Sequence, residues 1–372
     1  MKIKVGITGQ SGFMGTHLFN FLTIKSDEIE LMPFEDSFFE NDNKLKEFIG
    51  SCDKIVHLAG MNRHGDSQVI YDTNIRLANQ LIKNASEIKH FPHIIFSSSI
   101  QEDSDNPYGR SKKEARLLMQ KWAEKNNVRF NGLIIPNVFG PFGKPFYNSV
   151  IATFSYQLTH NQEPKIQIDS DLKLIYINEL TEIFYKAIKG KISENEYRVE
   201  HTSEYKVSDI LEKMKSYKTI YLQNKIIPDL WINFDIALFN TFRSYIDYSN
   251  NPVYLDVHSD NRGNLFEIIR TLTKGQIFYS TTKPGITRGN HYHTRKIERF
   301  CVIGGKALIK LRKIGVDKVY EYEVNGDRPS FIDIPLFHVH SITNIGNENL
   351  FTLFWTNELF DPEDPDTFSQ LI

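Results

Sequence analysis

Two side chains that could transfer a proton, Tyr108 and Lys112, lie four residues apart. The residues just before them, Asp105-Asn106-Pro107, are typical of a helix start, so both side chains should fall on one helical face. The pKa of free tyrosine is about 10, and a neighbouring ammonium group favours the phenolate and would lower that value. The pair therefore suits general acid–base catalysis, although a solvated Tyr–Lys pair on a helix surface has the same spacing.

Three consecutive serines, Ser97 to Ser99, stand at the end of an apolar run that predicts a strand over residues 93–98. A serine hydroxyl at that strand end could hydrogen-bond the carbonyl oxygen of a substrate beside Tyr108. The family resemblance described below implies Ser99 for this role, with Ser98 as the close second.

A glycine-rich segment follows the first predicted strand and opens a helix, with glycines at positions 9, 12 and 15. Glycines allow a tight turn and a close approach of the backbone to a pyrophosphate, which the free N–H groups and the dipole of the helix attract. The segment indicates a phosphate site. A plain strand-to-helix turn has the same glycines, so this segment does not decide the matter by itself.

Four side chains with metal-ligand chemistry lie in the last third of the chain. His291 and His293 fall on one face of a predicted strand, and Glu298 follows after a turn. Further along the chain, His340 offers a third imidazole. Three neutral nitrogens and one carboxylate suit Zn²⁺, and also Fe²⁺, Mn²⁺ or Ni²⁺. The alternative is that His291 and His293 are surface loop residues.

The elements that must position these side chains change in character along the chain. Up to about residue 140, short apolar runs alternate with helical patterns, which is typical of βα units around a parallel sheet. The five predicted strands are residues 2–7, 29–34, 54–59, 93–98 and 131–136. After about residue 250, short β-rich runs with glycine turns and no long amphipathic helix predict an all-β jelly roll. The polar segment 247–252 favours a boundary that gives domains 1–247 and 248–372.

Composition limits the classes of function. A chain of 372 residues is long enough for about two domains. Its 44 basic and 46 acidic residues stay balanced on both sides of residue 250, so we expect no nucleic-acid partner and no membrane partner. Cys52 and Cys301 are too few for a disulfide framework, and no run of about 18 apolar residues occurs. We expect a soluble, cytoplasmic protein that acts on a small molecule.

Residues 1 to about 245 resemble the extended short-chain dehydrogenase/reductase family, through TGxxGFxG at 8–15, His57-Leu58-Ala59-Gly60, the serine triplet and YxxxK at 108–112. The resemblance implies an α/β Rossmann domain that binds NAD(P), in which Tyr108 donates a proton, Lys112 grips the ribose and lowers the pKa of Tyr108, and Ser99 orients the carbonyl. It further implies that the coenzyme is held by Gly9, Gln10, Ser11, Gly12, Phe13, Met14, Gly15, Leu58, Ala59, Gly60, Tyr108 and Lys112.

Two details of this half bear on substrate and coenzyme. Members of the family often carry an arginine three residues before the asparagine of an R-x-x-N-x-x-G segment; here Asn137 is present and Ile134 replaces the arginine. We expect Asn137 and Asn148 to contact the substrate, ordinary packing being the alternative. An acidic group at the end of the second strand, such as Glu35, would favour NAD(H), unless it is a solvated loop residue. We nevertheless expect NADP(H), on the strength of the resemblance.

Residues 250–372 resemble the cupin family, because the spacings around His291, His293, Glu298 and His340 match both of its signature motifs. One departure is Phe337, where the second motif usually has glycine. We expect these four residues to bind a metal, with Zn²⁺ as the choice because neither oxygen nor redox chemistry is needed. His338 is an additional imidazole, either an acid–base group near the site or a solvent-exposed turn residue, and we favour the second reading.

Within the cupins, residues 260–267 look like the RG-x-[FL]-x-E region of nucleotide-sugar 3,5-epimerases. The two halves in this order, with PYGRSK, KPGITRGNHYH and WTNELFDPEDPDT, are similar throughout to bifunctional enzymes of capsular polysaccharide synthesis. That resemblance implies C3 epimerisation of a UDP-2-acetamido-2,6-dideoxy-hexos-4-ulose by the cupin. The Rossmann domain would then reduce C4 with NAD(P)H to give the UDP-2-acetamido-2,6-dideoxy-L-talose.

Two alternatives remain open. One is a single-step reductase of a nucleotide 4-keto-sugar, whose cupin serves only structure or dimerisation. The other is a redox-sensing binding protein without turnover, against which the intact set of Tyr108, Lys112 and Ser99 argues. Both families commonly form dimers, so we expect a homodimer.

Overall fold

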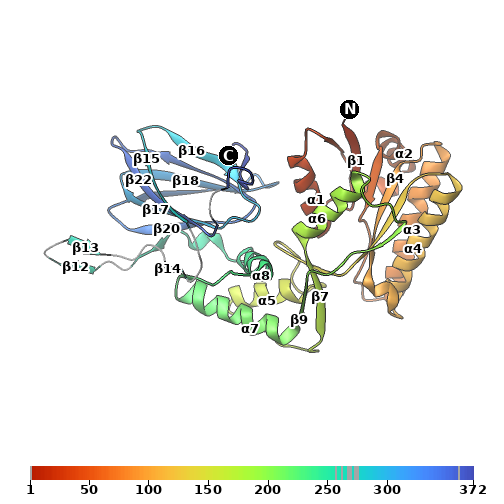
Figure 1. Ribbon diagram of the computed structural model, residues 1–372, viewed down its shortest axis with the longest axis horizontal. Helices are drawn as coiled ribbons and strands as arrows, with labels where there is room; N and C mark the ends of the chain where they lie inside the picture. The colour runs from red at the N-terminus through yellow and green to blue at the C-terminus, as the bar shows by residue number, and fades with distance from the viewer. Residues whose placement is uncertain (1, 256–257, 261–262, 266–269, 272–275, 359–360) are drawn as a thin grey trace. The chain divides into compact units, whose positions relative to one another are not determined.

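The computed structural model describes residues 2–255, 258–260, 263–265, 270–271, 276–358 and 361–372 (Figure 1). These residues form two compact units, which are described separately below. The first comprises Met1–Phe154 and Lys165–Ile210, and the second comprises Ser155–Pro164 and Leu211–Ile372. The domain boundary expected after residue 247 stays a prediction.

The first unit is built on a six-stranded parallel sheet in the order β2-β1-β3-β4-β5-β8. Its central strands are buried on both faces and are therefore almost continuously apolar, as in residues 130–135. The strands are β1 (Ile3–Thr8), β2 (Ile29–Met32), β3 (Lys54–His57), β4 (His93–Ser99), β5 (Phe130–Ile135) and β8 (Glu196–Arg198). The five strands predicted from the sequence are confirmed.

Helices cover both faces of this sheet, because each has an apolar stripe at helical spacing. One core layer joins the sheet to α2, α3 and α4, and another joins it to α1 and α6. The helices are α1 (Phe13–Ile24), α2 (Asp42–Ser51), α3 (Ser67–Glu87), α4 (Pro107–Lys125) and α6 (Ile177–Ile188), with 3-10 turns η1 (Asp36–Glu40) and η2 (Ile100–Asp103). The doubly wound α/β Rossmann fold expected for this half is confirmed.

A smaller three-stranded sheet, in the order β6-β7-β9, follows the main sheet. Its strands are β6 (Asn137–Phe139), β7 (Asp171–Tyr176) and β9 (Ser203–Lys206). Two further helices, α5 (Val150–Thr159) and α7 (Val207–Tyr217), each contain residues of both compact units. The three strands of this sheet were missed by the sequence analysis; β6 and β9, with three and four residues, carry too little periodicity to predict a strand.

The second unit contains a sandwich of two five-stranded antiparallel sheets, in the orders β11-β20-β17-β22-β15 and β19-β18-β21-β16-β23. Its core gathers the inward side chains of both sheets, among them Ile309, Ile332 and Leu350. The strands are β11 (Val253–Tyr254), β15 (Gln276–Thr282), β16 (Thr287–Tyr292), β17 (Glu298–Gly304), β18 (Lys306–Lys313), β19 (Val319–Asn325), β20 (Ser330–Ile334), β21 (His338–Asn344), β22 (Leu350–Thr356) and β23 (Phe368–Ser369). The all-β class predicted for this half is confirmed.

Short elements complete the second unit. They are η3 (Lys218–Gln223), β10 (Ile226–Ile227), α8 (Asn233–Arg243), η4 (Tyr248–Asn250), β12 (His258–Asp260), β13 (Gly263–Leu265) and β14 (Arg270–Thr271). Arg262 and Glu267 of the region compared with 3,5-epimerases lie outside the described residues.

A buried polar cluster joins η3 to the sandwich. Arg299 is 2 % exposed and binds Asp333 through two of its nitrogens, at 2.8 and 3.1 Å. The hydroxyl of Tyr221 donates to the same carboxylate. Arg299 also donates to the carbonyl of Lys225 at 3.2 Å. Because the Tyr221 hydroxyl and a backbone carbonyl just after η3 are partners of this buried ion pair, the segment around η3 and the sandwich are held in one arrangement.

Candidate active site and metal centre

The glycine-rich loop connects β1 to α1 in a conformation that only glycines allow. Gly9 has φ +70°, and a Cβ there would lie 2.7 Å from the amide nitrogen of Ala59. A Cβ on Gly15 would lie 2.2 Å from the carbonyl oxygen of Gly9. Gly12 caps α1 without a side-chain hydrogen bond, and the first turn carries no acidic residue. The N-terminus of α1 is thus suited to a phosphate group.

The end of β3 is held against this loop. The hydroxyl of Thr8 lies 2.6 Å from Nδ1 of His57 and accepts the amide of Ala59 at 3.3 Å. Gly60 continues this segment toward α4, since a Cβ on Gly60 would lie 3.6 Å from Nζ of Lys112. The structure therefore brings the predicted coenzyme segments at 9–15 and 58–60, together with Lys112, to one edge of the sheet.

Tyr108 and Lys112 stand in the first turns of α4, as the sequence predicts. Asn106 caps the helix by accepting the amide of Gly109 at 2.8 Å, and Pro107 occupies its first turn. The ammonium of Lys112 lies 4.8 Å from the ring centre of Phe96 and 6.0 Å from that of Tyr108. Burial lowers the pKa of Lys112 to about 8, and the charge of Glu102 opposes that shift.

The pKa of Tyr108 moves in the direction opposite to the one expected. Burial raises it to about 12, because burial disfavours the phenolate, and a hydrogen bond with Ser99 opposes the shift. Lys112 is not among the groups that produce it. Lowering of this pKa by Lys112 therefore stays a prediction. A protonated phenol is nevertheless the form that donates a proton.

The three serines differ in their partners. Ser97 donates to the carbonyl of His57 at 3.2 Å. Ser98 donates to the buried carboxylate of Glu102, which Arg116 binds at 2.9 Å. Ser99 is the serine that hydrogen-bonds Tyr108. The choice of Ser99 over Ser98 is thereby supported, and the Glu102–Arg116 pair that occupies Ser98 was missed by the sequence analysis.

The two predicted substrate residues are exposed. Asn137 donates to the carbonyl of Lys173 at 3.2 Å, and Asn148 lies in the segment after β6. Arg63 donates to two backbone carbonyls of that segment, that of Phe146 at 2.7 Å and that of Tyr147. Tyr147 interacts electrostatically with Tyr108 and raises its pKa. Tyr147 is therefore near enough to Tyr108 to interact with it, and the sequence analysis did not name it, while Asn137 and Asn148 stay predictions.

The four predicted metal ligands converge in the sandwich. His291 on β16 pairs across the sheet with His340 on β21, and Glu298 begins β17. One candidate ligand atom from each of His291, His293, Glu298 and His340 lies within 4.8 Å of the others. The Glu298 carboxylate is 3.1 Å from Nε2 of His293 and 3.3 Å from Nε2 of His340. Three imidazoles and a carboxylate at these distances form a suitable donor set for Zn²⁺.

The protonation states of His291 and Glu298 suit ligation, whereas, despite burial, the hydrogen bond with Glu298 raises the pKa of His293. Burial lowers the pKa of His291 to about 4, so that its imidazole is neutral at pH 7. Burial opposes ionisation of Glu298, but pairing with His293 and His340 holds the pKa of Glu298 below its ordinary range. Nε2 of His340 is buried and lies 3.3 Å from the Glu298 carboxylate, but it makes no hydrogen bond of good geometry among the described residues, as expected for an atom placed to bind a metal. Neutral imidazoles and an ionised carboxylate are the forms that bind metals.

His338 differs from the expectation that it is a solvent-exposed turn residue. It is 3 % exposed and begins β21, with Nδ1 2.9 Å from the carbonyl of Leu336. Its ring lies edge-on to that of Tyr248, with ring centres 5.3 Å apart. Burial lowers the pKa of His338 to about 4. The exposed reading is therefore wrong, because alternation along β21 places His338 on the same inward face as His340.

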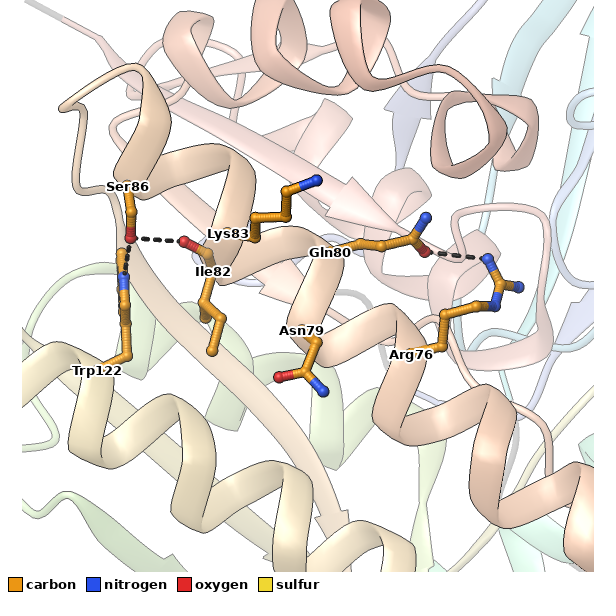
Figure 2. Close-up of a pocket in the computed structure, with 7 residues that line it drawn as sticks. All are labelled: Arg76, Asn79, Gln80, Ile82, Lys83, Ser86 and Trp122. Atoms are coloured by element: carbon orange, nitrogen blue, oxygen red, sulfur yellow. Dashed lines mark hydrogen bonds between the residues drawn. The ribbon is translucent and has the colours of Figure 1, made fainter.

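A cavity of about 630 Å³ lies on α3 and α4, with Arg76, Lys83 and Trp122 among its lining residues (Figure 2). Trp122 donates to Ser86 there at 2.9 Å. None of the predicted catalytic or coenzyme-binding residues lines it. We therefore place the chemistry at the edge of the sheet and not in this cavity.

Comparison with known proteins assigns both halves. Residues 5–199 match the NAD dependent epimerase/dehydratase family, and residues 258–368 match the polysaccharide biosynthesis C-terminal domain. The chain belongs to the NAD dependent epimerase/dehydratase family. A nicotinamide coenzyme is therefore the cofactor of the first unit. No helix in the described parts of the chain has both the length and the apolar character needed to cross a membrane.

Two relatives match over essentially the whole chain. UDP-2-acetamido-2,6-beta-L-arabino-hexul-4-ose reductase of Pseudomonas aeruginosa is 32 % identical, over 99 % of this chain and 98 % of the relative. The crystal structure of the capsular polysaccharide assembling protein CapF from Staphylococcus aureus is 33 % identical, with complete coverage of both chains and a TM-score of 0.64. RMD from Pseudomonas aeruginosa, solved with NADPH, shares the fold over 59 % of this chain at 18 % identity and a TM-score of 0.53.

Proposed function

We propose that this chain epimerises C3 of a UDP-2-acetamido-2,6-dideoxy-hexos-4-ulose in its cupin domain and then reduces C4 in its Rossmann domain. The product is the UDP-2-acetamido-2,6-dideoxy-L-talose, for the synthesis of N-acetylfucosamine in capsule or O-antigen. The observation that carries the proposal is the coexistence of two sites on one chain, the Ser99–Tyr108–Lys112 group and the convergent cluster of three histidines and Glu298. The relatives named for a hexul-4-ose reductase and for capsule assembly support the substrate class.

The chemistry fixes the order of the two steps. The proton on C3 is acidic only while C4 is a ketone, because the carbanion must delocalise into an enolate. A base removes that proton, and a proton is returned to the opposite face of C3. Reduction converts the ketone to an alcohol and ends this acidity. Epimerisation therefore comes first.

The residues of α4 and β4 carry out the reduction. The coenzyme supplies a hydride to C4 when it is bound. Tyr108 gives its phenolic proton to the oxygen on C4, which its raised pKa allows because the phenol is protonated at neutral pH. Ser99 holds that oxygen beside the phenol, and Lys112 holds the ribose and provides positive charge. The N-terminus of α1 binds the pyrophosphate.

The metal would be held by His291, His293, Glu298 and His340. We propose Zn²⁺, which would polarise the C4 carbonyl or stabilise the sandwich. The neutral imidazole of His291 and the ionised carboxylate of Glu298 are the forms that bind it, whereas His293, whose pKa is raised by Glu298, would give up a proton on binding. His338 stays outside this set, since it is not part of the group of close ligand atoms that the other four residues form.

The test separates the two steps. Purified protein is incubated with the UDP-4-keto-sugar in D₂O, first without coenzyme and then with NADPH, and mass spectrometry follows deuterium at C3 and the mass of the product. Incorporation at C3 without coenzyme, followed by reduction on adding NADPH, is expected. Reduction without prior incorporation would reject the epimerase and leave a single-step reductase with a structural or dimerising cupin. If no keto-sugar caused oxidation of NADH or NADPH, the two-step enzyme and the single-step reductase would both be rejected.

A further inference from the structure

The C-terminal residues 364–370, called the C-terminal strap below, form an edge of the sheet that carries the candidate metal ligands. Phe368 and Ser369 form β23, which pairs antiparallel with β16 and places Ser369 opposite His291. Gln370 donates its amide to the carbonyl of Asn290 at 2.8 Å. The strap thus continues the β16 ladder on the side away from β21.

Asp366 connects the strap to the turn between two of the ligands. It is 3 % exposed, and its carboxylate accepts the backbone amides of Thr294 at 3.1 Å, Arg295 at 2.9 Å and Lys296 at 2.8 Å. It also accepts the hydroxyl of Thr294 at 2.6 Å. These amides lie between His293 and Glu298, so one buried carboxylate fixes the backbone that sets the spacing of these ligands.

The main chain of Asp366 fixes His293 itself. Nδ1 of His293 lies 2.5 Å from the carbonyl oxygen of Asp366. A carbonyl oxygen can only accept, so Nδ1 carries a hydrogen, which leaves Nε2, on the side of Glu298, as the ring atom that can bind a metal. The corresponding partner of His340 is the carbonyl of His338, two residues away on the same strand. The ring orientation of His293, unlike that of His340, therefore depends on a residue 73 positions further along the chain.

Ionic contacts flank this connection. Arg295 binds the carboxylate of Asp364 at 2.8 Å, and Lys296 donates to the carbonyl of Pro365. Both basic residues belong to the turn that Asp366 holds. The turn and the strap are thus joined by backbone, side-chain and charged contacts, so undocking the strap would release the turn and the ring of His293 together.

We propose that the C-terminal strap completes the metal site, with Asp366 as the positioning residue that sets the tautomer and orientation of His293. This inference rests on the metal site of the proposed function and adds the coupling between that site and the chain end. A metal ion binds more tightly to the docked form than to the undocked form. By reciprocity, the ion stabilises docking of the strap to the same extent.

The experiment measures the Zn²⁺ affinity of the full-length protein by competition with a chromogenic chelator, and it needs neither sugar nor coenzyme. Asp366→Ala should lower the affinity roughly ten- to hundredfold, as is typical when the partner of a ligating histidine is disturbed. Asp366→Asn keeps an acceptor of similar size and should recover part of the loss. The matched control is Glu363→Ala, which removes an exposed carboxylate just before the C-terminal strap and should leave the affinity unchanged.

A spectroscopic reading separates positioning from a general loss of stability. In Co²⁺-loaded protein, the visible absorption reports the ligand geometry, and Asp366→Ala should shift or weaken these bands. Ile309→Val, which removes a buried methyl group from the core of the same sandwich, should preserve them. Amide hydrogen exchange of the unaltered protein gives a reading that does not depend on any variant. Zn²⁺ should slow exchange at residues 294–296 and in the strap.

The outcomes distinguish the strap from the site it rests on. If Asp366→Ala binds Zn²⁺ as tightly as the unaltered protein, or if Zn²⁺ leaves exchange in the strap and in residues 294–296 unchanged, the coupling is wrong while the metal site stands. If the unaltered protein binds no Zn²⁺, the metal site and the coupling are both rejected.

Discussion

The hydroxyl of Ser99 is hydrogen-bonded to the phenol of Tyr108, whereas the neighbouring Ser98 is occupied by Glu102. We therefore expect Ser99→Ala to lower the rate of C4 reduction by a factor on the order of 10², because the substrate carbonyl loses the donor that orients it toward Tyr108. Stopped-flow oxidation of NADPH measures this rate. Ser97→Ala, whose hydroxyl faces the carbonyl of His57, is the matched control. Equal losses of rate in the two variants would show that Ser99 does not orient the substrate carbonyl.

Tyr108→Phe should abolish C4 reduction, with a loss of about 10²–10⁴-fold, because the proton donor is gone. Deuterium incorporation at C3 should continue at the unaltered rate, since the proposed function assigns that exchange to the cupin. Mass spectrometry of the sugar after incubation in D₂O measures it. Loss of both activities in a folded Tyr108→Phe protein would contradict the separation of the two steps.

The pKa of about 8 at Lys112 predicts a pH dependence of coenzyme binding. As pH rises through this value the ammonium is lost, so the affinity for NADPH should fall above about pH 8. Lys112→Ala should bind NADPH more weakly at every pH and lose this dependence. Fluorescence titration at pH 7 and pH 9 tests it. Unchanged affinity in Lys112→Ala would reject the contact with the ribose.

The same depressed pKa has a consequence for stability. The unfolded chain binds the Lys112 proton more tightly than the folded protein, because the pKa is near 10.5 when the side chain is solvated. The contribution of Lys112 to the unfolding free energy should therefore rise with pH between about 8 and 10.5. Urea unfolding of the unaltered protein and Lys112→Met across this range isolates that contribution, and parallel curves would contradict it.

Asp36 is the carboxylate that reaches the glycine-rich loop, where it accepts the hydroxyl of Ser11 at 2.9 Å. Glu35, the residue singled out from the sequence, is exposed and accepts from Ser37. We keep the expectation of NADPH as coenzyme. Asp36→Ser should raise kcat/KM for NADPH relative to NADH severalfold, because a carboxylate beside the ribose repels a 2′-phosphate. Glu35→Ser should have little effect. A preference for NADH in the unaltered protein would show that NADPH is the wrong choice.

His340→Ala should lose most of the bound metal, whereas His338→Ala should retain it and lose stability because a buried ring is removed. Elemental analysis of the purified variants measures metal content, and thermal unfolding measures stability. Chelation of the unaltered protein should lower the unfolding temperature of the C-terminal unit, since the ion binds the folded form. If His340→Ala kept its metal and His338→Ala lost it, His338 and not His340 would be the ligand.

Local patterns predicted the fold classes, because alternating βα units and short β-rich runs each carry their own periodicity. They also predicted which side chains would meet when the spacing lies within one element or one hairpin, as for Tyr108 with Lys112 and for His291 with His293. The convergence of His340 with these histidines depends on the pairing of β16 with β21, which the resemblance to cupins supplied.

Contacts between distant parts of the chain escaped prediction. The partner of His293 is a backbone carbonyl at Asp366, and carbonyl groups leave no mark in a sequence. The choice between Asp36 and Glu35 depends on the exact path of one turn. The burial of His338 depends on where β21 begins, and a boundary shifted by a few residues changes the face that a side chain occupies.

The cluster of Tyr221, Asp333 and Arg299 has a practical consequence for dissecting the protein. A gene fragment starting at codon 248 would encode the sandwich without the tyrosine that donates to Asp333 and without the carbonyl of Lys225 that Arg299 uses. Such a fragment would expose a buried arginine–carboxylate pair and leave two of its hydrogen bonds unmade, so it should be less stable than the same domain in the full chain. A fragment starting at Val207, where α7 begins, retains these partners and is the better choice for isolating the cupin activity.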